Sequence, residues 1–402
     1  MRVKVLTICD HPAMRTGQGI IHRHICQGLL ENGYDVVSLG WSPEHIENKL
    51  PWFIYTTEKS KYFGEDLLDQ IIYHERPDIL ITIGDIWNFR YVPGINNRKF
   101  VQWVAYTAID GEAHGGGIPE SWKPILNDAD RIVTYTNYGK NAICKSMPGE
   151  SSKIEIIPHG VDINNFYPLS DSERLSLRKK YGIAEDYIIY LLVARNQFRK
   201  NIPEIFKAWK EFKKDGKHEK ALLWPHMLFQ DPFGNNLNEL IRILGIQDSL
   251  VFFQEFAQAK SNLDTIPDSH MNQLYNMADV SLLCSGEGFG FSLVESMATA
   301  KPIITLDHSA CAELVNGVGE LVDVDYYITG VHNTERPYPS QKSLIEKMDK
   351  LYYDSELRQK YSKAGLNKSK LFIWKDVHSK WSKYLRTVID PLSNNLVLDV
   401  IA

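Results

Sequence analysis

Short apolar runs alternate with longer amphipathic stretches along most of the chain, and this alternation limits the possible folds more than any other feature. A helical pattern from about Gly19 to Asn32 has apolar residues at every fourth position, and Gly33 suits its end. The apolar runs of the first half predict strands at Val3–Cys9, Val36–Leu39, Ile79–Ile83, Phe100–Tyr106 and Arg131–Tyr135. This order of strands and helices predicts an α/β fold, with a parallel sheet that helices cover on both faces.

A second series of the same kind follows, with predicted strands at Tyr187–Val193, Ala221–Pro225, Leu250–Phe253, Val280–Leu283 and Pro302–Thr305. The polar, helix-prone segment Ser170–Ile183 separates the two series, so we place a domain boundary near Pro168. The 402 residues also exceed the ~250–300 at which single cores stop growing. We expect domains at 1–168 and 169–372 and a helical tail over 373–402, with Trp374 and Trp381 as packing anchors.

Charge and cysteine content argue against several classes of protein. The net charge of −5 argues against a general nucleic-acid binder. Five widely spaced cysteines without a Cys-x-x-Cys pair indicate neither a disulfide framework nor a zinc site, and they fit a reducing cytosol. No uncharged apolar stretch approaches the ~20 residues of a membrane span, and the N-terminal residues read as a strand rather than a signal peptide. We expect a cytoplasmic protein and leave a peripheral membrane contact open.

Two glycines, Gly17 and Gly19, stand between the first predicted strand and the first predicted helix. Glycine lets backbone N–H groups approach a ligand, and a helix N-terminus favours anions, so a phosphate or diphosphate is the natural guest. The spacing is not the dinucleotide-binding G-x-G-x-x-G, because His22 stands where the third glycine would be. A tight strand-to-helix turn without a ligand remains the alternative.

A basic pair follows the first strand of the second series, where Arg195 ends the apolar run and Lys200 comes five residues later. Ligands of open α/β sheets bind beyond the carboxyl ends of the strands. Arginine brackets phosphate oxygens and lysine supplies a compact charge, so the pair could hold a diphosphate without a metal. The alternative is a solvated loop, which fits Lys200 alone better than Arg195.

The stretch GEGFGFSLVESMATAKPIITL carries two glutamates, Glu287 in a glycine loop and Glu295 in the helix that follows. Between them the start of the helix presents unpaired N–H groups. A carboxylate, an anion-binding backbone and a second carboxylate match the sugar hydroxyls, the diphosphate and the ribose hydroxyls of a nucleotide-sugar. The alternatives are an exposed loop acid for Glu287 and a charge that complements the helix dipole for Glu295.

Several segments together resemble the retaining glycosyltransferases of the two-domain GT-B type, specifically family 4 (glycosyl transferases group 1). The segments are the E-x7-E signature Glu287–Glu295, its lead-in Tyr275–Ser285, the hinge-proximal Ile154–Pro168, the phosphate loop Val193–Asn201 and the terminal Phe372–Leu385. The resemblance implies the GT-B fold, in which two Rossmann-like domains with parallel sheets face each other across a cleft. It also implies that the helix in 373–402 returns to the first domain.

The resemblance also assigns roles to individual residues. Arg195 and Lys200 would grip the donor diphosphate, Glu287 would bind the transferred sugar and Glu295 would hold the ribose. The residues near the sugar and the β-phosphate would be Phe289, Gly290, Phe291 and Ser292. Gly17 and Gly19 would close on the donor from the other domain. Because the family needs no metal, we expect no cofactor besides the donor substrate, and we read Asp323–Asp325 as a turn at a strand end.

The chain departs from the family pattern at three places. His159 stands where Asn is usual, and Ala300 stands where Gly is usual before x-Pro. No histidine ends the first-domain strand at which many members carry one. Asp110 and His114 are the nearest polar candidates to assist catalysis, and the sequence leaves the choice between them open.

These features predict a retaining, metal-independent hexosyltransferase that moves a sugar from a nucleoside-diphosphate sugar to the hydroxyl of a glycan, a lipid-linked or another acceptor, as in polysaccharide biosynthesis. One alternative is a non-catalytic nucleotide-sugar-binding protein on the same fold. Another is a glycoside hydrolase, whose two carboxylates would lie about 5 Å or roughly 6.5–9.5 Å apart across one bond. Specific nucleic-acid binding is not expected.

Overall fold

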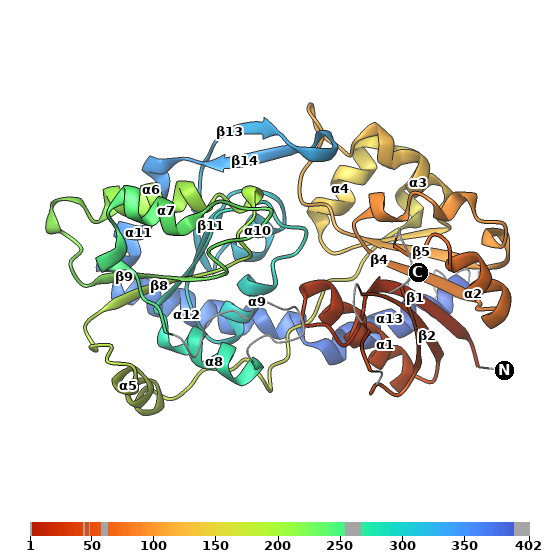
Figure 1. Ribbon diagram of the computed structural model, residues 1–402, viewed down its shortest axis with the longest axis horizontal. Coiled ribbons are helices and arrows are strands. Elements are labelled where there is room, and N and C mark those ends of the chain that lie inside the picture. Colours follow the sequence, from red (N-terminus) through yellow and green to blue (C-terminus); the bar gives the residue numbers. More distant parts are fainter. Residues whose placement is uncertain (1, 43–44, 48, 58–62, 254–266, 390–402) are drawn as a thin grey trace, which may run out of the picture. The chain divides into compact units, whose positions relative to one another are not determined.

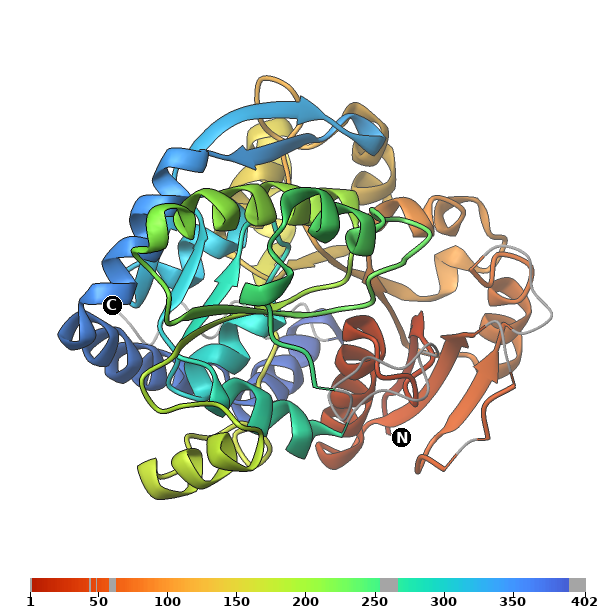
Figure 2. The same ribbon diagram turned by 60° about the vertical axis from the view of Figure 1, so that its left-hand side comes forward.

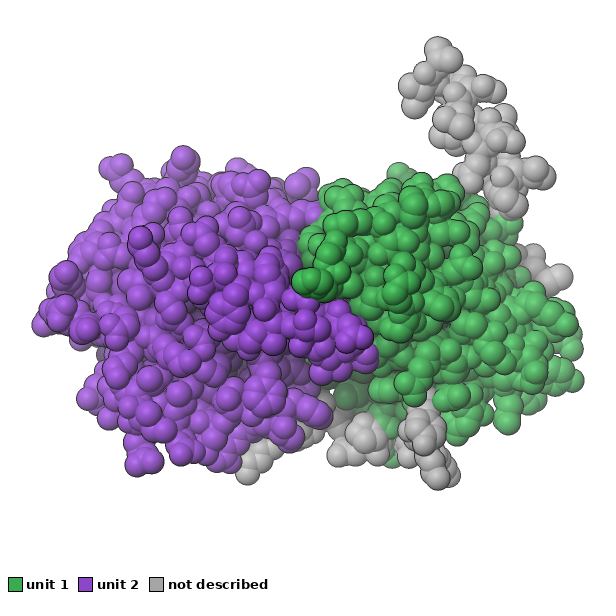
Figure 3. All heavy atoms as spheres, turned by 90° about the horizontal axis from the view of Figure 1, so that it is seen from above, with its two compact units in different colours: residues 1–160, 374–402 green, residues 161–373 purple. Residues whose placement is uncertain are grey.

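The computed structural model describes residues 2–42, 45–47, 49–57, 63–253 and 267–389 of the chain. Contacts within the chain divide it into two compact units, which Figure 3 distinguishes by colour: unit 1 comprises residues 1–160 and 374–402, and unit 2 comprises residues 161–373. The chain therefore enters unit 2 at Val161, ahead of the boundary that we expected near Pro168.

Unit 1 is built on a seven-stranded parallel sheet in the order β3-β2-β1-β4-β5-β6-β7 (Figure 1). The strands are β1 (Lys4–Asp10), β2 (Asp35–Trp41), β3 (Phe53–Thr56), β4 (Ile79–Gly84), β5 (Gln102–Thr107), β6 (Arg131–Thr134) and β7 (Ile154–Ile156). The helices are α1 (Gly17–Glu31), α2 (Leu68–Glu75), α3 (Lys123–Asp128), α4 (Asn137–Ser146) and α13 (Trp374–Ile389). The strands predicted for the first half are confirmed, and β3 and β7 extend the sheet at its two edges.

The C-terminal helix α13 belongs to unit 1, where it packs along α1. Trp374 and Trp381 are buried, as predicted, and the indole of Trp374 stacks on the imidazole of His24 with ring centroids 4.2 Å apart. The hydroxyl of Tyr34 donates a hydrogen bond to the carbonyl of Ser382 at 3.1 Å. A segment from the end of the chain thus completes the core of the unit in which the chain begins.

Unit 2 is built on a five-stranded parallel sheet in the order β12-β11-β10-β8-β9. The strands are β8 (Ile188–Val193), β9 (Ala221–His226), β10 (Val280–Leu283), β11 (Ile303–Leu306) and β12 (Gly319–Val322). The helices are α5 (Asp171–Lys180), α6 (Ile202–Phe212), α7 (Leu237–Leu244), α8 (Asp268–Met277), α9 (Phe291–Ala298), α10 (Ser309–Val315), α11 (Gln341–Tyr353) and α12 (Ser355–Ser369). Helices α6, α7 and α11 cover one face of the sheet, and α8, α9 and α12 cover the other (Figure 1).

Two predictions for unit 2 are wrong in detail. The predicted strand Leu250–Phe253 is reduced to a single bridge between Leu250 and Leu223, because Val251 is buried while Phe252 is 52% exposed and the run does not face the sheet as a whole. The predicted turn Asp323–Asp325 instead leads from β12 directly into an antiparallel hairpin of β13 (Val324–Thr329) and β14 (Glu335–Pro339). Figure 2 shows this hairpin, in blue, outside the parallel sheet.

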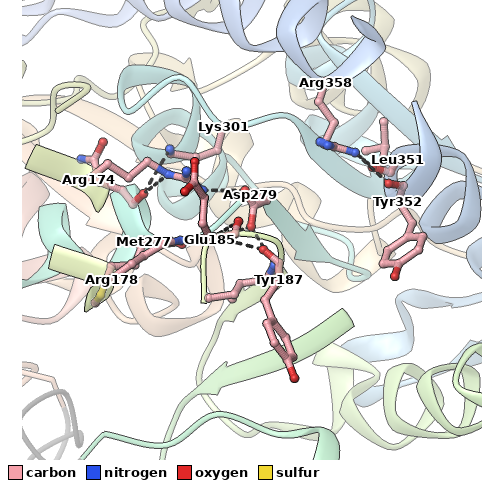
Figure 4. A network of polar contacts seen from close by, with 12 residues as sticks. Arg174, Arg178, Glu185, Tyr187, Met277, Asp279, Lys301, Leu351, Tyr352 and Arg358 are labelled. Carbon is pink, nitrogen blue, oxygen red and sulfur yellow. Dashed lines mark hydrogen bonds and ion pairs between the residues drawn. The ribbon is translucent and has the colours of Figure 1, made fainter. Parts of the chain in front are cut away.

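A buried polar network ties α5 to the amino-terminal ends of β8 and β10 (Figure 4). The carboxylate of Asp279 accepts hydrogen bonds from Arg174 at 2.6 Å, from Arg178 at 2.5 Å and from the backbone N–H of Ile189 at 2.8 Å. The guanidinium of Arg178 is 1% exposed and also donates to the carbonyls of Met277 and Tyr187. Because its donors meet backbone carbonyls and a carboxylate, this network fixes the two strands whose opposite ends carry the candidate site.

Within the described ranges, no helix has both the length and the apolar composition that crossing a membrane requires.

Candidate functional site

The candidate site of unit 2 lies where the carboxyl ends of β8 and β10 meet. The two strands are neighbours and run parallel, so their ends reach the same edge of the sheet. The loop after β8 passes through a 3-10 turn, Phe198–Lys200, and the loop after β10 carries Glu287. Two residues 87 positions apart in sequence, Lys200 and Glu287, are thereby in direct contact.

The carboxylate of Glu287 is 8% exposed, and its hydrogen-bonding partners are cations and a hydroxyl. It forms an ion pair with the ammonium of Lys200, accepts a hydrogen bond from the Ser285 hydroxyl at 2.5 Å and lies 3.4 Å from Nη1 of Arg199. Burial acts to raise the pKa of Glu287, but Lys200, Arg199 and the hydroxyl outweigh it and lower this pKa to about 2. Glu287 is therefore ionised at neutral pH.

The backbone N–H and carbonyl of Glu287 are also hydrogen-bonded. Its N–H donates to the hydroxyl of Ser309 at 2.9 Å, and its carbonyl accepts from the N–H of Ala310 at 3.4 Å. Both partners belong to the first turn of α10. The loop after β10 is thus anchored to the helix that follows the neighbouring strand, and the carboxylate is fixed in position.

Lys200 is 8% exposed, and burial is the main reason that its pKa is lowered. Arg199 lowers this pKa further, while Glu287 raises it. The adjacent Arg199 was not among the predicted site residues, although its Nη1 also donates to the carbonyl of Gly286 at 3.2 Å. Two cations on one side and one carboxylate on the other leave an excess positive charge at this edge.

Arg195 lies in the same loop, but the structure pairs it with another residue. Its guanidinium donates to the carboxylate of Asp231 at 2.7 and 3.4 Å and lies 5.4 Å from the ring centre of Phe233. Its side chain is 54% exposed. The role of Arg195 at a diphosphate stays a prediction, and Asp231, which the sequence analysis did not single out, is its partner in the structure.

The glycine loop ends where α9 begins, and Gly290 caps this helix with a φ of +97°. A side chain at Gly290 would be strained by this backbone conformation, and its Cβ would lie 3.0 Å from Leu293. The first intrahelical bond of α9 is made by the N–H of Leu293 to the carbonyl of Gly290 at 3.1 Å, so the N–H groups of Phe291 and Ser292 ahead of it stand at an anion-favouring position. Phe289 precedes them with its ring 4% exposed.

Glu295 lies on the second turn of α9 and is partly buried. Among the residues that the structure describes, no cation contributes to the shift of its pKa. Its Oε2 accepts a hydrogen bond from the hydroxyl of Tyr275 at 2.7 Å. Burial raises the pKa of Glu295 to about 7, the charge of Asp268 contributes in the same direction, and the hydrogen bond from Tyr275 opposes them. The two signature carboxylates therefore sit in opposite electrostatic environments.

Ala300 follows the end of α9 with a φ of +57°. The residue lies past the end of the helix, in the left-handed region. The N–H of Ala300 bonds to the carbonyl of Met297, and the N–H of Lys301 bonds to that of Ser296, which closes the helix end. Glycine, the usual residue of the family, would adopt this conformation without strain.

The remaining predicted residues belong to unit 1. Gly17 is the first, exposed residue of α1, and the N–H of Gly19 donates to the capping hydroxyl of Thr16 at 2.9 Å. A Cβ at Gly19 would come within 2.5 Å of the carbonyl oxygen of Met14, so the close turn alone requires this glycine. Asp110, partly buried, and His114, exposed, follow β5, and both make contacts within the protein.

His159 is a core residue of unit 1. Its Nδ1 lies 2.7 Å from the hydroxyl of Tyr106, and its ring lies against that of Tyr135. Burial lowers the pKa of His159 to about 3, so the imidazole is neutral at physiological pH. The departure from the family pattern at this position is therefore accommodated by a buried hydrogen bond.

Comparison with known proteins agrees with this geometry. Residues 173–368, all in unit 2, match the model of the family glycosyl transferases group 1. An uncharacterised glycosyltransferase of Methanocaldococcus jannaschii is 22% identical over 79% of this chain and 84% of its own length. Sequence similarity therefore extends beyond the matched domain into unit 1.

Solved structures show the same fold over nearly the whole chain. Sucrose-phosphate synthase from Thermosynechococcus elongatus superimposes with a TM-score of 0.74, at 18% identity over 97% of this chain and 100% of that one. Anabaena HepE in complex with UDP-glucose gives 0.70, at 14% identity over 96% and 100%. The predicted GT-B fold is confirmed, and the comparisons together support a glycosyltransferase on this fold.

Proposed function

We propose that this protein is a retaining, metal-independent glycosyltransferase of family 4 that transfers a hexose from a nucleoside-diphosphate sugar to an acceptor hydroxyl. The observation that carries the proposal is the buried pair of Glu287 and Lys200, placed beside the N-terminus of α9 and eight residues ahead of Glu295. The Anabaena neighbour, whose structure contains UDP-glucose, makes a nucleotide-sugar the donor class of choice.

The proposed donor is bound by charge and by hydrogen bonds along one line of the site. Glu287, ionised and held by Lys200, accepts hydrogen bonds from hydroxyls of the sugar. The diphosphate lies against the first turn of α9 and the cations Arg199 and Lys200. Arg195 exchanges its ion pair with Asp231 for a contact with the diphosphate. Glu295 accepts from the ribose hydroxyls.

In the proposed reaction the bond between the anomeric carbon and the diphosphate oxygen breaks, while a bond to the acceptor oxygen forms on the same face. The negative charge that develops on the leaving diphosphate is stabilised by donors already in position before the reaction. Fixed cations replace a metal in this role. Asp110 or His114 of unit 1 would receive or relay the proton of the acceptor.

The proposal is tested with a panel of UDP-, GDP- and ADP-sugars, scored for thermal stabilisation of the protein and for slow release of the nucleoside diphosphate. We expect one class of nucleotide-sugar to stabilise the protein, and we expect release of its nucleoside diphosphate to persist in excess EDTA. Stabilisation without release on any acceptor would instead indicate a non-catalytic binding protein. Hydrolysis of simple glycosides, without nucleotide dependence, would indicate a glycoside hydrolase.

A further inference from the structure

The side-chain hydroxyl of Tyr275 contacts Glu295, one of the two signature carboxylates. It lies near the C-terminal end of α8, fully buried, with its ring edge-on to Phe166 at 6.0 Å between centroids. Its hydroxyl donates a hydrogen bond of 2.7 Å to Oε2 of Glu295. The pKa of this hydroxyl is raised well above its usual value by burial and by the charge of Glu295, so Tyr275 stays a neutral donor.

The surroundings of Glu295 otherwise oppose its ionisation. Asp268, at the start of the same helix α8, repels a second negative charge, and burial removes water from the carboxyl. No cation from the described parts of β10, β11, α10 or α12, which also pack against α9, offsets these effects. The Tyr275 hydroxyl is the group that favours the charged form, although the pKa of Glu295 still rises to about 7.

The charge state of this carboxyl decides what it can bind. An ionised carboxylate accepts two hydrogen bonds at once, from the two hydroxyls of a ribose, whereas a protonated carboxyl must donate one of its own. A donor fixed on Oε2 also leaves Oε1 and the second lone pair of Oε2 free to accept other hydrogen bonds. The tyrosine therefore controls both orientation and charge.

We propose that Tyr275 is a positioning residue that keeps the Glu295 carboxylate ionised and correctly oriented for the ribose hydroxyls of the nucleotide. The inference rests on the proposed function, because it takes Glu295 as the ribose-binding group. Tyr275 itself does not touch the donor. Nucleotide affinity should then depend on pH around neutrality, and the tyrosine should set the pH at which this dependence occurs.

The test compares wild type with Tyr275→Phe in titrations of UDP, GDP and ADP by calorimetry between pH 6 and pH 9. The phenyl ring keeps the packing and removes only the hydroxyl. If loss of the hydrogen bond moves the ionisation of Glu295 upward by one pH unit, binding at pH 7 weakens about fivefold, and the loss nearly vanishes at pH 9. Titration of the phosphates is common to both proteins and cancels in the ratio.

Two controls separate positioning from structural damage. Tyr361→Phe removes an equivalent hydrogen bond, from the Tyr361 hydroxyl to Oε1 of Glu320 at 2.8 Å, and should leave nucleotide affinity unchanged. The 2′,3′-dideoxy form of the preferred nucleotide should bind wild type and Tyr275→Phe equally. If Tyr275→Phe does not fold, Glu295→Gln replaces it: the ratio of wild-type to Glu295→Gln affinity should then rise from pH 6 to pH 9, and a ratio constant with pH would overturn the inference.

Equal affinity of wild type and Tyr275→Phe at every pH, or an equal loss with the dideoxy nucleotide, would overturn the inference while leaving the proposed function standing. If wild type binds none of the three nucleotides, the proposed function fails and the inference fails with it. A loss that is confined to ribonucleotides and recovers at high pH supports both.

Discussion

The ammonium of Lys200 and the carboxylate of Glu287 form a buried ion pair between the loops that follow two neighbouring parallel strands. Both side chains are about one-tenth exposed. Removing Glu287 would leave the buried ammonium of Lys200 without this carboxylate, which costs several kcal/mol. The pair therefore links the stability of unit 2 to the groups proposed to bind the donor.

This ion pair predicts how stability depends on acid. The pKa of Glu287 is about 2 in the folded protein and about 4.5 when unfolded, so its contribution is complete above pH 4.5 and is lost as the pH falls toward 2. Glu287→Gln imitates the protonated form and should destabilise unit 2 by about 2–4 kcal/mol at pH 6. The deficit in Tm, measured by thermal denaturation, should shrink toward pH 3. A deficit that is constant with pH would contradict this role.

Ala300 predicts a stabilising substitution. Its φ of +57° is costly for a residue with a Cβ, and Ala300→Gly should raise the stability of unit 2 by about 0.5–1 kcal/mol after the greater freedom of glycine in the unfolded chain is counted. Ala298→Gly, two residues earlier at the last residue of α9, is the matched control and should destabilise, because glycine has the lower helix propensity. Thermal denaturation of the two variants checks the sign. A lower Tm for Ala300→Gly would show that position 300 is not strained.

Lys301 predicts a second pH dependence of stability, in an alkaline window. Burial is the main cause that lowers the pKa of Lys301 to about 7, with Arg174 adding to it, against an ordinary value of 10.5. The unfolded chain therefore holds more protons between pH 7 and pH 10.5, and stability at this site rises with pH across that window. Lys301→Met should thus raise the Tm relative to wild type at pH 6.5, and the gain should diminish by pH 9.5. A gain that grows with pH would refute the assignment.

The sheet architecture could be predicted from the sequence because short apolar runs such as Val280–Leu283, which are buried on both faces, alternate with longer amphipathic stretches. The sequence placed Lys200 and Glu287 after parallel strands and so at one edge of the sheet, but it did not predict the ion pair that they form. Individual site residues were harder to predict from the sequence than the sheet. Arg199 stands beside another cation, and nothing in its spacing distinguishes it from a solvated residue.

Other features depend on tertiary contacts that have no recognisable pattern in the sequence. Asp231 pairs with Arg195 through a loop after β9, and its type and spacing give no hint of that partner. The hairpin β13–β14 is exposed along much of β13, so the alternation that marks a half-buried strand is missing. Leu250–Phe253 has the composition of a strand, but a single bridge is all that it forms.

The charge of Glu295 is a further example. Its place in the signature was evident from the sequence, whereas the hydroxyl of Tyr275 beside it depends on how α8 packs against α9. Only the folded geometry shows that the two signature glutamates have opposite pKa shifts. The spacing of eight residues between Glu287 and Glu295 does not indicate that their pKa values shift in opposite directions.

The central claim is that Glu287 binds the transferred sugar in a nucleotide-sugar site, and one measurement tests it most directly. The rate of nucleoside diphosphate release from the preferred donor is compared for wild type, Glu287→Gln and Glu346→Gln, the last being the same change at a carboxylate that is 60% exposed on α11. Loss of a preorganised polar group at a reacting centre costs about 100–1,000-fold in rate. We predict such a loss for Glu287→Gln at a pH where it remains folded, with Glu346→Gln unchanged. A Glu287→Gln variant that releases nucleotide at the wild-type rate would contradict the claim.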